Sequence, residues 1–237
     1  MFENLPKAWL KENELDFVRA LLFIVKDVID QPSQANTQAE EALMLVFKTC
    51  HEDFLQVLKN TESVEELLKK ATNENMQNED SIDGEAKEMS QETRDAYRFS
   101  LWLKLITPEL ASAHPSIRSI AQKLLDYVTK TSEKSSKEIL TFIIPELERL
   151  FSPEHFQKQS RKGKTGIIEC LAYLLACKPQ VVSISSSVKD VMKFANEYAG
   201  SKHDGAFSEE DRQIYKKLRI GCLRLLTRYV NCAEVQD

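Results

Sequence analysis

The chain has 237 residues, of which 42% are hydrophobic, so it can bury a sizeable core. Only 6 residues are glycine, which favours helices over an all-β fold with many tight turns. The longest fully apolar run, residues 20–25, is far too short for a membrane-spanning helix, which needs about 20 residues. The net charge of −5 is uneven, with −11 on residues 1–92 and +6 on residues 93–237. This asymmetry is either a solvated pattern or a face for nucleic acid or an acidic partner.

The first helix is predicted from apolar residues that recur every three or four positions. We expect it to begin at Asn13 as the N-cap, with Glu14 in its first turn, and to stop before Pro32. Its inward face is predicted to carry Leu15, Val18, Leu22, Val25 and Ile29. Three further helices are predicted over residues 37–50, 52–59 and 63–71.

Residues 72–92 interrupt the helical pattern. The stretch 73–80 has almost no apolar content, so it cannot bury enough surface to offset the entropy lost on ordering. We therefore predict an acidic disordered loop at 72–92. It separates N-terminal helical repeats (1–71) from C-terminal helical repeats (93–237), and the repeats on either side form one continuous solenoid.

Helices resume after this loop and are punctuated by prolines. They are predicted over residues 93–106, 116–129, 135–151, 164–177, 187–198 and 208–230. Pro145 lies inside an apolar pattern and is expected to kink or split its helix. Ser208 and Asp211 resemble a capping box at the start of the last helix.

Two of these helices share a local pattern, Ile117-Arg118-x-x-Ala121-x-x-Leu124-Leu125 and Leu218-Arg219-x-x-Cys222-x-x-Leu225-Leu226. An apolar–Arg pair is followed by a small residue and then by a Leu pair, as in the second helix of a HEAT repeat. A weaker copy lies around Cys170. The copies are slightly farther apart than typical HEAT periods of about 40–47 residues. We predict an all-α fold, a HEAT/armadillo-like α-solenoid of antiparallel helix pairs with an acidic disordered insertion.

The sequence offers no catalytic or cofactor motif. Gly163-Lys164-Thr165 ends like a P-loop, but Lys158 stands where the first glycine belongs, and no strand precedes it. The four histidines have no partner at metal-ligand spacing and are expected at the surface. The five cysteines form no CxxC pair, which indicates an intracellular, reducing compartment, and no signal peptide is recognisable. We predict no enzyme, cofactor, metal site, small-molecule substrate or membrane association.

Two basic clusters are the only candidate interaction surface. They consist of Lys158, Arg161, Lys162 and Lys164, and of Arg212, Lys216 and Lys217. Such short runs bind nucleic acid, an acidic protein or an import factor in some proteins, and in others they form a solvated loop between helices. Few aromatic residues are interleaved with them, so we expect no direct nucleic-acid binding.

The N-terminal 27 residues carry the most specific motif. They read Leu5-Pro6-x-x-Trp9, then Phe17-x-Arg19-Ala20-Leu21-Leu22-Phe23, then Asp27. This segment resembles part of the long HEAT region of the transformation/transcription domain-associated protein family. That family has Leu-Pro-x-x-Trp, a Phe eight residues after the Trp, x-Lys-Ala-Leu-Leu-Phe and an Asp four residues on. The spacing matches without a gap, and Arg19 replaces the Lys.

Two later blocks resemble the same family in the same order. Ile117-Arg118-x-x-Ala121, after His114-Pro115-Ser116, is similar to a Val-Arg-x-x-Ala helix that follows a loop. Leu218-Arg219-Ile220-x-x-Leu223-x-x-Leu226 is similar to the family's Leu-Arg-Ile-x-x-Leu-x-x-Leu. The resemblance therefore runs over most of the chain.

The resemblance implies a non-catalytic scaffold. Members of the family are giant helical-repeat proteins of the phosphatidylinositol-3-kinase-related class, whose kinase-like domain lacks catalytic residues and lies far C-terminal of this region. They are nuclear subunits of histone acetyltransferase coactivator complexes and receive transcription activators. We expect a segment of the middle HEAT-repeat region of such a pseudokinase scaffold, located in the nucleus, with other complex subunits and activators as partners. The alternative is a HEAT-repeat protein associated with nucleic acid or ribonucleoprotein assembly; an enzyme would require a cluster of titratable groups that the sequence does not show.

Overall fold

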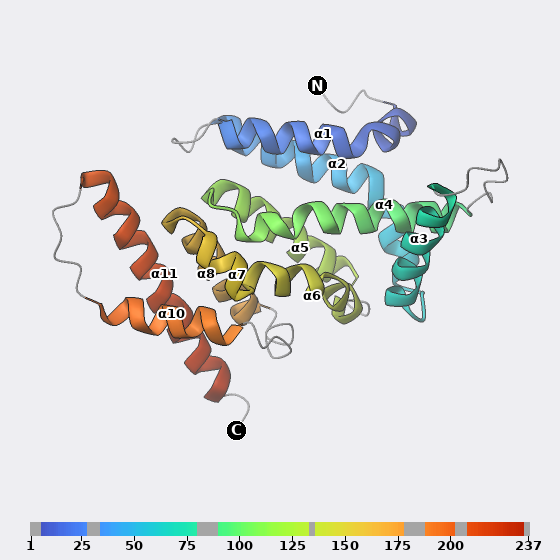
Figure 1. The fold of residues 1–237 in the computed structure, drawn as a ribbon. Coiled ribbons are helices and arrows are strands. Elements are labelled where there is room, and N and C mark those ends of the chain that lie inside the picture. The colour runs from blue at the N-terminus through green and yellow to red at the C-terminus, as the bar shows by residue number, and fades with distance from the viewer. Residues whose placement is uncertain are drawn as a thin grey trace. The chain divides into compact units, whose positions relative to one another are not determined.

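The structure is a computed structural model that describes residues 6–27, 34–79, 90–132, 136–177, 188–201 and 208–234. Helices, turns and bends make up these ranges, and no strand occurs within them, which confirms the all-α prediction (Figure 1). The chain divides into two compact units. The first consists of Met1–Ile106 with Ser119–Ile143, and the second of Thr107–Arg118 with Ile144–Asp237.

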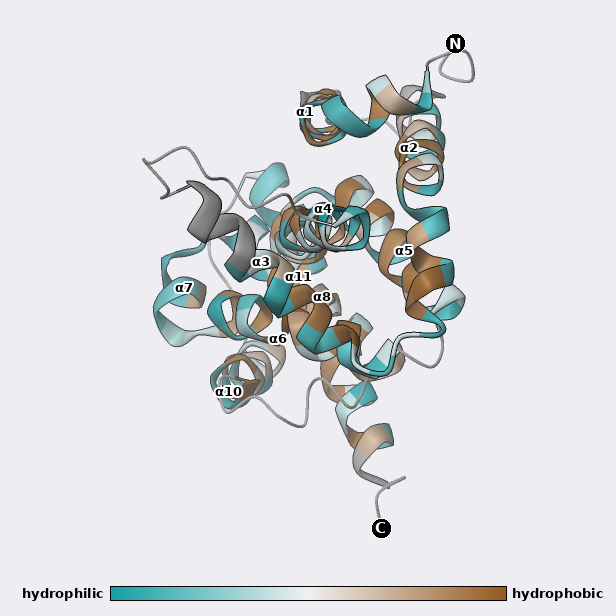
Figure 2. Ribbon diagram, turned by 90° about the vertical axis from the view of Figure 1, so that its right-hand side faces the viewer, coloured by the Kyte–Doolittle hydropathy of each residue, from teal (hydrophilic) through white to brown (hydrophobic). Residues whose placement is uncertain are grey.

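The first unit is built from two helix pairs and parts of two further helices. Helix α1 (Lys7–Asp27) packs against α2 (Gln34–Leu58), and α3 (Val64–Glu79) packs against α4 (Gln91–Ile106). Most of α5 (Pro115–Thr131) and the first half of α6 (Ser136–Phe151) complete the unit. Hydrophobic residues alternate with hydrophilic ones along these helices (Figure 2), as amphipathic packing requires.

Aromatic rings form the centre of the first unit. The Phe47 ring meets the Trp102 ring edge-on at a centroid distance of 4.8 Å, and it also contacts the rings of Phe99 and Tyr127. Phe54 packs on Phe99 at 5.5 Å. These large side chains come from α2, α4 and α5, so the core fixes three helices at once.

The second unit is organised around two long helices. Helix α8 (Arg161–Cys177) packs along α11 (Glu209–Glu234), and α10 (Val188–Gly200) packs on α11 as well. The unit also contains the 3₁₀ helix η2 (Pro108–Ala111) and the short α7 (Pro153–Lys158). Helix η2 lies so close to α8 that a Cβ on Gly166 would come within 2.3 Å of the Ala111 carbonyl oxygen. Glycine at this position therefore permits the close approach of the two backbones.

The start of the first helix differs from the sequence prediction. Helix α1 begins at Lys7, and Asn13 lies inside it, with its side-chain amide donating to the Trp9 carbonyl oxygen at 2.9 Å. The predicted N-cap at Asn13 is therefore wrong, and Glu14 lies well beyond the first turn. The expected stop at Pro32 falls outside the described residues.

The predicted break within the second helix is also absent. Helix α2 runs unbroken from Gln34 to Leu58, where two helices were predicted. His51 lies at the expected break and is 2% exposed, because its side chain packs among the rings of Phe47, Phe99 and Trp102. Tertiary packing therefore carries the helix through a position that the local sequence marked as a boundary.

The predicted loop is partly helical. Helix α3 continues to Glu79 and α4 includes Gln91 and Glu92, so residues 72–79 and 91–92 are ordered helix; residues 80–89 lie outside the described ranges. Buried residues such as Leu68 anchor the start of α3, and the polar stretch 72–79 that follows contains no Gly or Pro to end the helix. Extending a formed helix costs little, which explains why low apolar content did not stop it.

The compact units also differ from the predicted division at the loop. The first unit includes α4, which was assigned to the C-terminal repeats, and the division falls within α5 and α6. Helix α6 is not split at Pro145, whose ring is exposed. On an exposed side the carbonyl group that loses its helical donor can bond to water, so the helix continues.

Candidate interaction surface

The structure places all seven predicted basic residues in the second unit. Lys158 ends α7, while Arg161, Lys162 and Lys164 belong to the first turns of α8. Arg212, Lys216 and Lys217 lie in the first turns of α11. The two clusters meet through ion pairs between the beginnings of α8 and α11.

Acidic residues at the start of α11 neutralise much of this positive charge. Arg161 lies 3.7 Å from the Asp211 carboxylate and Lys162 lies 3.3 Å from Glu210. Arg212 lies 3.9 Å from Glu209 in its own helix. Carboxylates gather in the first turn because they interact favourably with the helix dipole. The predicted capping box is present at the start of α11, since the Asp211 N–H donates to Ser208 Oγ at 3.1 Å.

Two of the predicted basic residues also lie over aromatic rings. The Arg161 guanidinium is 4.3 Å from the centroid of the Tyr215 ring. The Lys164 ammonium is 5.6 Å from the Phe156 centroid and 5.4 Å from the Phe194 centroid. These cation–π contacts join α8 to α7, α10 and α11, so both residues contribute to packing as well as to surface charge.

A cavity of about 250 Å³ opens beside Lys164. Its floor contains Phe156, which is 4% exposed, and Phe194, whose ring meets that of Phe156 edge-on at 5.0 Å. The cavity is lined by Pro153, Phe156, Gln157, Lys164, Asp190, Lys193, Phe194 and Glu197. It is therefore an aromatic pocket with a charged rim.

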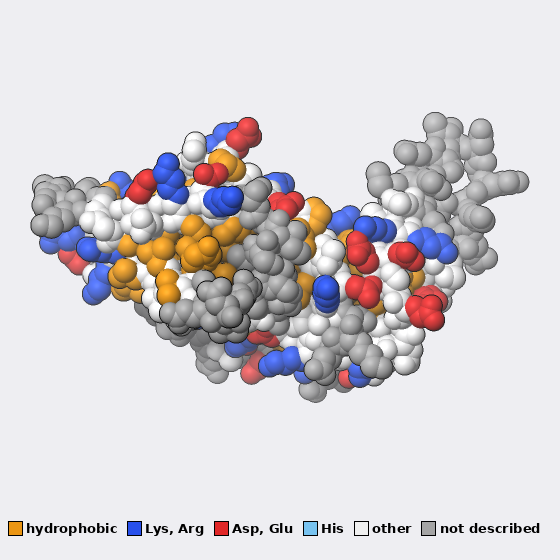
Figure 3. All heavy atoms as spheres, turned by 90° about the horizontal axis from the view of Figure 1, so that it is seen from below, with side chains coloured by type: hydrophobic (Ala, Val, Ile, Leu, Met, Phe, Trp, Pro, Cys, Tyr) orange, Lys and Arg blue, Asp and Glu red, His pale blue; other side chains and the backbone are white. Residues whose placement is uncertain are grey.

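The outward face of α11 carries an apolar row. Ile220, Leu223 and Val230 recur at helical spacing and are 44%, 50% and 53% exposed. Lys216 and Lys217 lie just before this row and are exposed. In Figure 3 hydrophobic side chains gather on the side where α10 and α11 lie, and Lys and Arg side chains border them.

Polar contacts fasten the inward face of α11 to α8. Both carboxylate oxygens of Glu169 accept hydrogen bonds from Arg224, at 2.8 and 2.7 Å. One helical turn on, Arg228 donates to the Ala172 carbonyl oxygen at 2.6 Å, and then Cys232 donates to that of Leu175 at 3.1 Å. This ladder, with buried Leu218, Cys222 and Leu225, holds α11 so that the apolar row faces outward.

The two arginines of the repeated sequence pattern have different roles. Arg118 is 9% exposed and donates to the Ser112 carbonyl oxygen at 2.6 Å. Burial lowers the pKa of its guanidinium, and the charge of Glu169 acts in the opposite direction. Arg219, at the equivalent place in α11, is exposed. A shared pattern therefore does not imply a shared environment.

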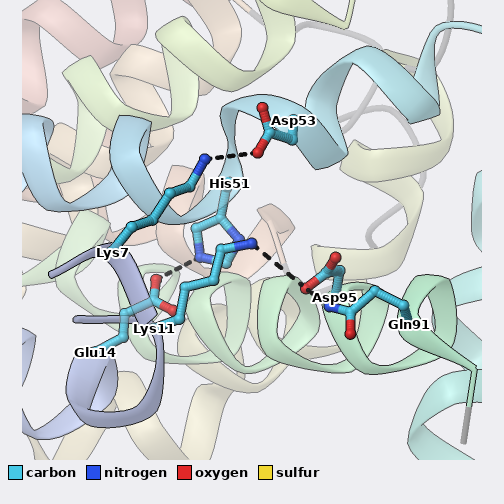
Figure 4. A network of polar contacts seen from close by, with 7 residues as sticks. All are labelled: Lys7, Lys11, Glu14, His51, Asp53, Gln91 and Asp95. Atoms are coloured by element: carbon cyan, nitrogen blue, oxygen red, sulfur yellow. Dashed lines mark hydrogen bonds and ion pairs between the residues drawn. The ribbon is translucent and has the colours of Figure 1, made fainter. Parts of the chain in front are cut away.

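The first unit contains a buried polar pair that the sequence prediction missed. Glu14 and His51 are each 2% exposed, and Glu14 Oε1 lies 2.5 Å from His51 Nε2 (Figure 4). The expectation of a surface histidine is therefore wrong for His51. One signal was available, because Glu14 lies four residues after Leu10 and four before Val18, on the row that faces the core.

Weaker ion pairs surround this buried pair. Lys7 lies 2.7 Å from Asp53, and Lys11 lies 3.9 Å from Asp95, which also accepts a hydrogen bond from Gln91 (Figure 4). Together they tie α1 to α2 and α4. Because Glu14 belongs to α1 and His51 to α2, the buried pair fastens these two helices together, and aromatic rings surround the His51 ring.

The buried thiols have the properties of core residues. Burial raises the pKa of Cys50, Cys170 and Cys222 to about 12, so these side chains are protonated and unreactive near neutral pH. Within the ranges that the structure describes, no three His, Cys, Asp or Glu side chains gather as a metal site. Nor does any helix in those ranges combine the length and apolar character needed to cross a membrane.

Comparison with known protein families assigns this architecture. The model of the Tra1 HEAT repeat ring region matches residues 1–237, the whole chain. Comparisons with curated proteins and with solved structures found no match. The match confirms both the predicted HEAT-like solenoid class and the resemblance to the transformation/transcription domain-associated proteins. The chain belongs to the Tra1 HEAT repeat ring family and is a helical-repeat scaffold of that type.

Proposed function

We propose that this chain is a protein-interaction scaffold segment of a nuclear transcription coactivator of the histone acetyltransferase type. The support is its membership of the Tra1 HEAT ring family. Helical-repeat arrays expose long surfaces that bind other proteins through shape and charge, and the function involves no bond-making step. Its partners are other subunits of the complex and transcription activators.

The outward face of α11 is the proposed docking surface for activators. The observation that carries this assignment is the apolar row of Ile220, Leu223 and Val230, preceded by Lys216 and Lys217. Amphipathic acidic segments complement such a face, because apolar side chains cover the row and carboxylates meet the lysines. Arg212 contributes less than the sequence suggested, since it faces Glu209.

The direct test is binding of an acidic amphipathic activation peptide to the full chain. The double variant Lys216→Glu/Lys217→Glu and the single variant Leu223→Ser should each weaken binding by about tenfold. The matched controls are Lys189→Glu on α10 and Val57→Ser on α2, which change exposed residues of the same types elsewhere. Equal binding by all four variants would remove α11 from the proposal.

The coactivator role is tested separately by capture of partners from nuclear extract with the tagged chain, identified by mass spectrometry. If histone acetyltransferase subunits are recovered with the original chain and with both α11 variants, the result supports the scaffold role independently of the activator face. Recovery of ribosomal or RNA-processing proteins in their place would contradict it and favour a ribonucleoprotein role. Steep salt dependence of binding to duplex DNA or RNA would argue in the same direction.

A further inference from the structure

We infer that the pocket between α7 and α10 is a second docking site, for a helical protein segment with one large apolar residue and an alternating row of charges. The inference concerns a different surface from the apolar row of α11. Either site can therefore fail its test while the other stands.

The floor of the pocket selects an apolar side chain. Phe156 and Phe194 present their rings to a cavity of about 250 Å³, below the usual range of roughly 300–1,000 Å³ for small-molecule sites. A space of this size suits one anchor side chain, such as Leu, Met or Phe, better than a cofactor. Aromatic-lined pockets of this kind are typical places for the residues that dominate a protein interface.

The floor does not favour a cationic ligand. Aromatic rings in pockets often bind alkylammonium groups, but here the Lys164 ammonium already lies within 5.6 Å of both ring centroids. A second cation would meet this charge at close range. A small anion is disfavoured too, because the carboxylates of Asp190 and Glu197 share the rim with the lysines.

The rim specifies the charges of the partner. Asp190, Lys193 and Glu197 follow one another at steps of three and four along α10, so they form a single row of alternating sign. All three are exposed, and none makes an ion pair or hydrogen bond with another described residue. A helix lying along α10 that presents a basic, an acidic and a basic residue at the same spacing would pair with each of them.

The test uses a designed helical peptide of about 18 residues, long enough to form helix in solution. It carries a Leu anchor beside a row of Lys, Glu and Lys spaced like the α10 row, and its binding to the full chain is followed by fluorescence anisotropy. We expect binding that weakens about tenfold when the Leu is replaced by Ala. We also expect about a tenfold loss with the triple variant Asp190→Lys/Lys193→Glu/Glu197→Lys. All three changed residues are exposed, so we expect the fold to be preserved, which the helical circular dichroism of the variant checks.

Rescue separates charge matching from general damage. A peptide with the reversed row Glu, Lys and Glu should bind the triple variant as well as the original peptide binds the original chain. The control is Lys189→Glu, because Lys189 is exposed on α10 but lies outside the pocket. It should leave the affinity of the chain for each of the two peptides unchanged. Absence of binding, no rescue, or tighter binding of a matched peptide with trimethyllysine in place of Leu would each overturn the inference. Loss of binding with Lys216→Glu/Lys217→Glu would also do so, by moving the site to α11.

Discussion

The two units place their charged groups differently. In the first unit Glu14 and His51 lie paired in the core, and aromatic rings surround His51. In the second unit the buried charge of Arg118 meets a backbone carbonyl instead of another charged side chain. Its charged pairs lie nearer the edge: Glu169 and Arg224, 19% and 47% exposed, join α8 to α11, and Arg161 rests on an aromatic face. A buried pair is costly to break, whereas edge contacts adjust at little cost. This difference suits a first unit with a fixed core and a second unit that carries the two proposed docking surfaces.

The largest effect is expected from breaking the buried pair. Glu14→Ala leaves His51 buried without its partner and should lower the free energy of unfolding of the first unit by about 3–4 kcal/mol. Both tryptophans of the chain, Trp9 and Trp102, lie in this unit, so urea unfolding followed by tryptophan fluorescence reports on it. Glu12→Ala, exposed on the same helix, should cost less than about 0.5 kcal/mol.

A double substitution sharpens this result. Glu14→Leu/His51→Leu removes both polar groups. The free energy of unfolding that it loses should therefore be smaller than the sum of the losses for Glu14→Leu and His51→Leu alone. An additive outcome would mean that the two side chains act independently. The contact between Glu14 and His51 would then contribute nothing to stability, and the contrast with the second unit would disappear.

A smaller effect is expected at the close approach of η2 and α8. Gly166→Ala places a Cβ 2.3 Å from the Ala111 carbonyl oxygen. This oxygen belongs to the backbone, so no side-chain rotation can relieve the clash. We expect a loss of about 2–3 kcal/mol in the second unit, after the gain in helix propensity is subtracted. Alkylation of Cys170 and Cys222, both 0% exposed, measures opening of this unit against urea.

Gly200→Ala is the matched control, because nothing lies within 4 Å of a Cβ there. It should leave stability unchanged or raise it by up to about 1 kcal/mol. If Gly166→Ala is as harmless as this control, η2 and α8 can move apart at little cost. The second unit would then be looser than its packing suggests.

Helix content and the HEAT class were readable from the sequence, because both follow from patterns of apolar residues. Val18, Leu22 and Val25 were placed correctly on the inner face of α1. Helix ends were less predictable, since Asn13 has the chemistry of an N-cap but lies inside the helix. Its role depends on where the buried row begins, at Leu10, which is a tertiary property.

The candidate surface was predictable only in part. The sequence singled out the basic residues of α8 and α11, but it could not show that Asp211 and Glu210 face Arg161 and Lys162. Those pairs join residues about 50 positions apart. The aromatic pocket was missed for the same reason, since Phe156 and Phe194 meet only after α7 and α10 pack. Local periodicity contains no information on such encounters.

The ion pair between α8 and α11 gives the third prediction. Glu169 is 19% exposed and Arg224 is 47% exposed, and two hydrogen bonds join them. A double-mutant cycle with Glu169→Gln and Arg224→Met should give a coupling of about 1 kcal/mol, which falls when salt is added. A coupling that equals the loss for Glu14 and His51 would erase the proposed difference between the units.

The smallest effect is expected for an exposed pair, Lys7 and Asp53, whose side chains are 52% and 72% exposed. A double-mutant cycle with Lys7→Met and Asp53→Asn should give a coupling of about 0.3 kcal/mol.

The hydrogen bond between the two side chains lowers the pKa of Asp53 and raises that of Lys7. The stabilisation is therefore complete above the ordinary carboxyl pKa of 3.8 and is lost as the pH falls through the lowered value. It is likewise complete below the ordinary ammonium pKa of 10.5 and is lost as the pH rises through the raised value. A coupling that is flat from pH 2 to 7 would show that Asp53 and Lys7 are not paired in solution. Helix α1 would then be held to its unit by the buried pair, the Lys11–Asp95 ion pair and its own buried apolar residues.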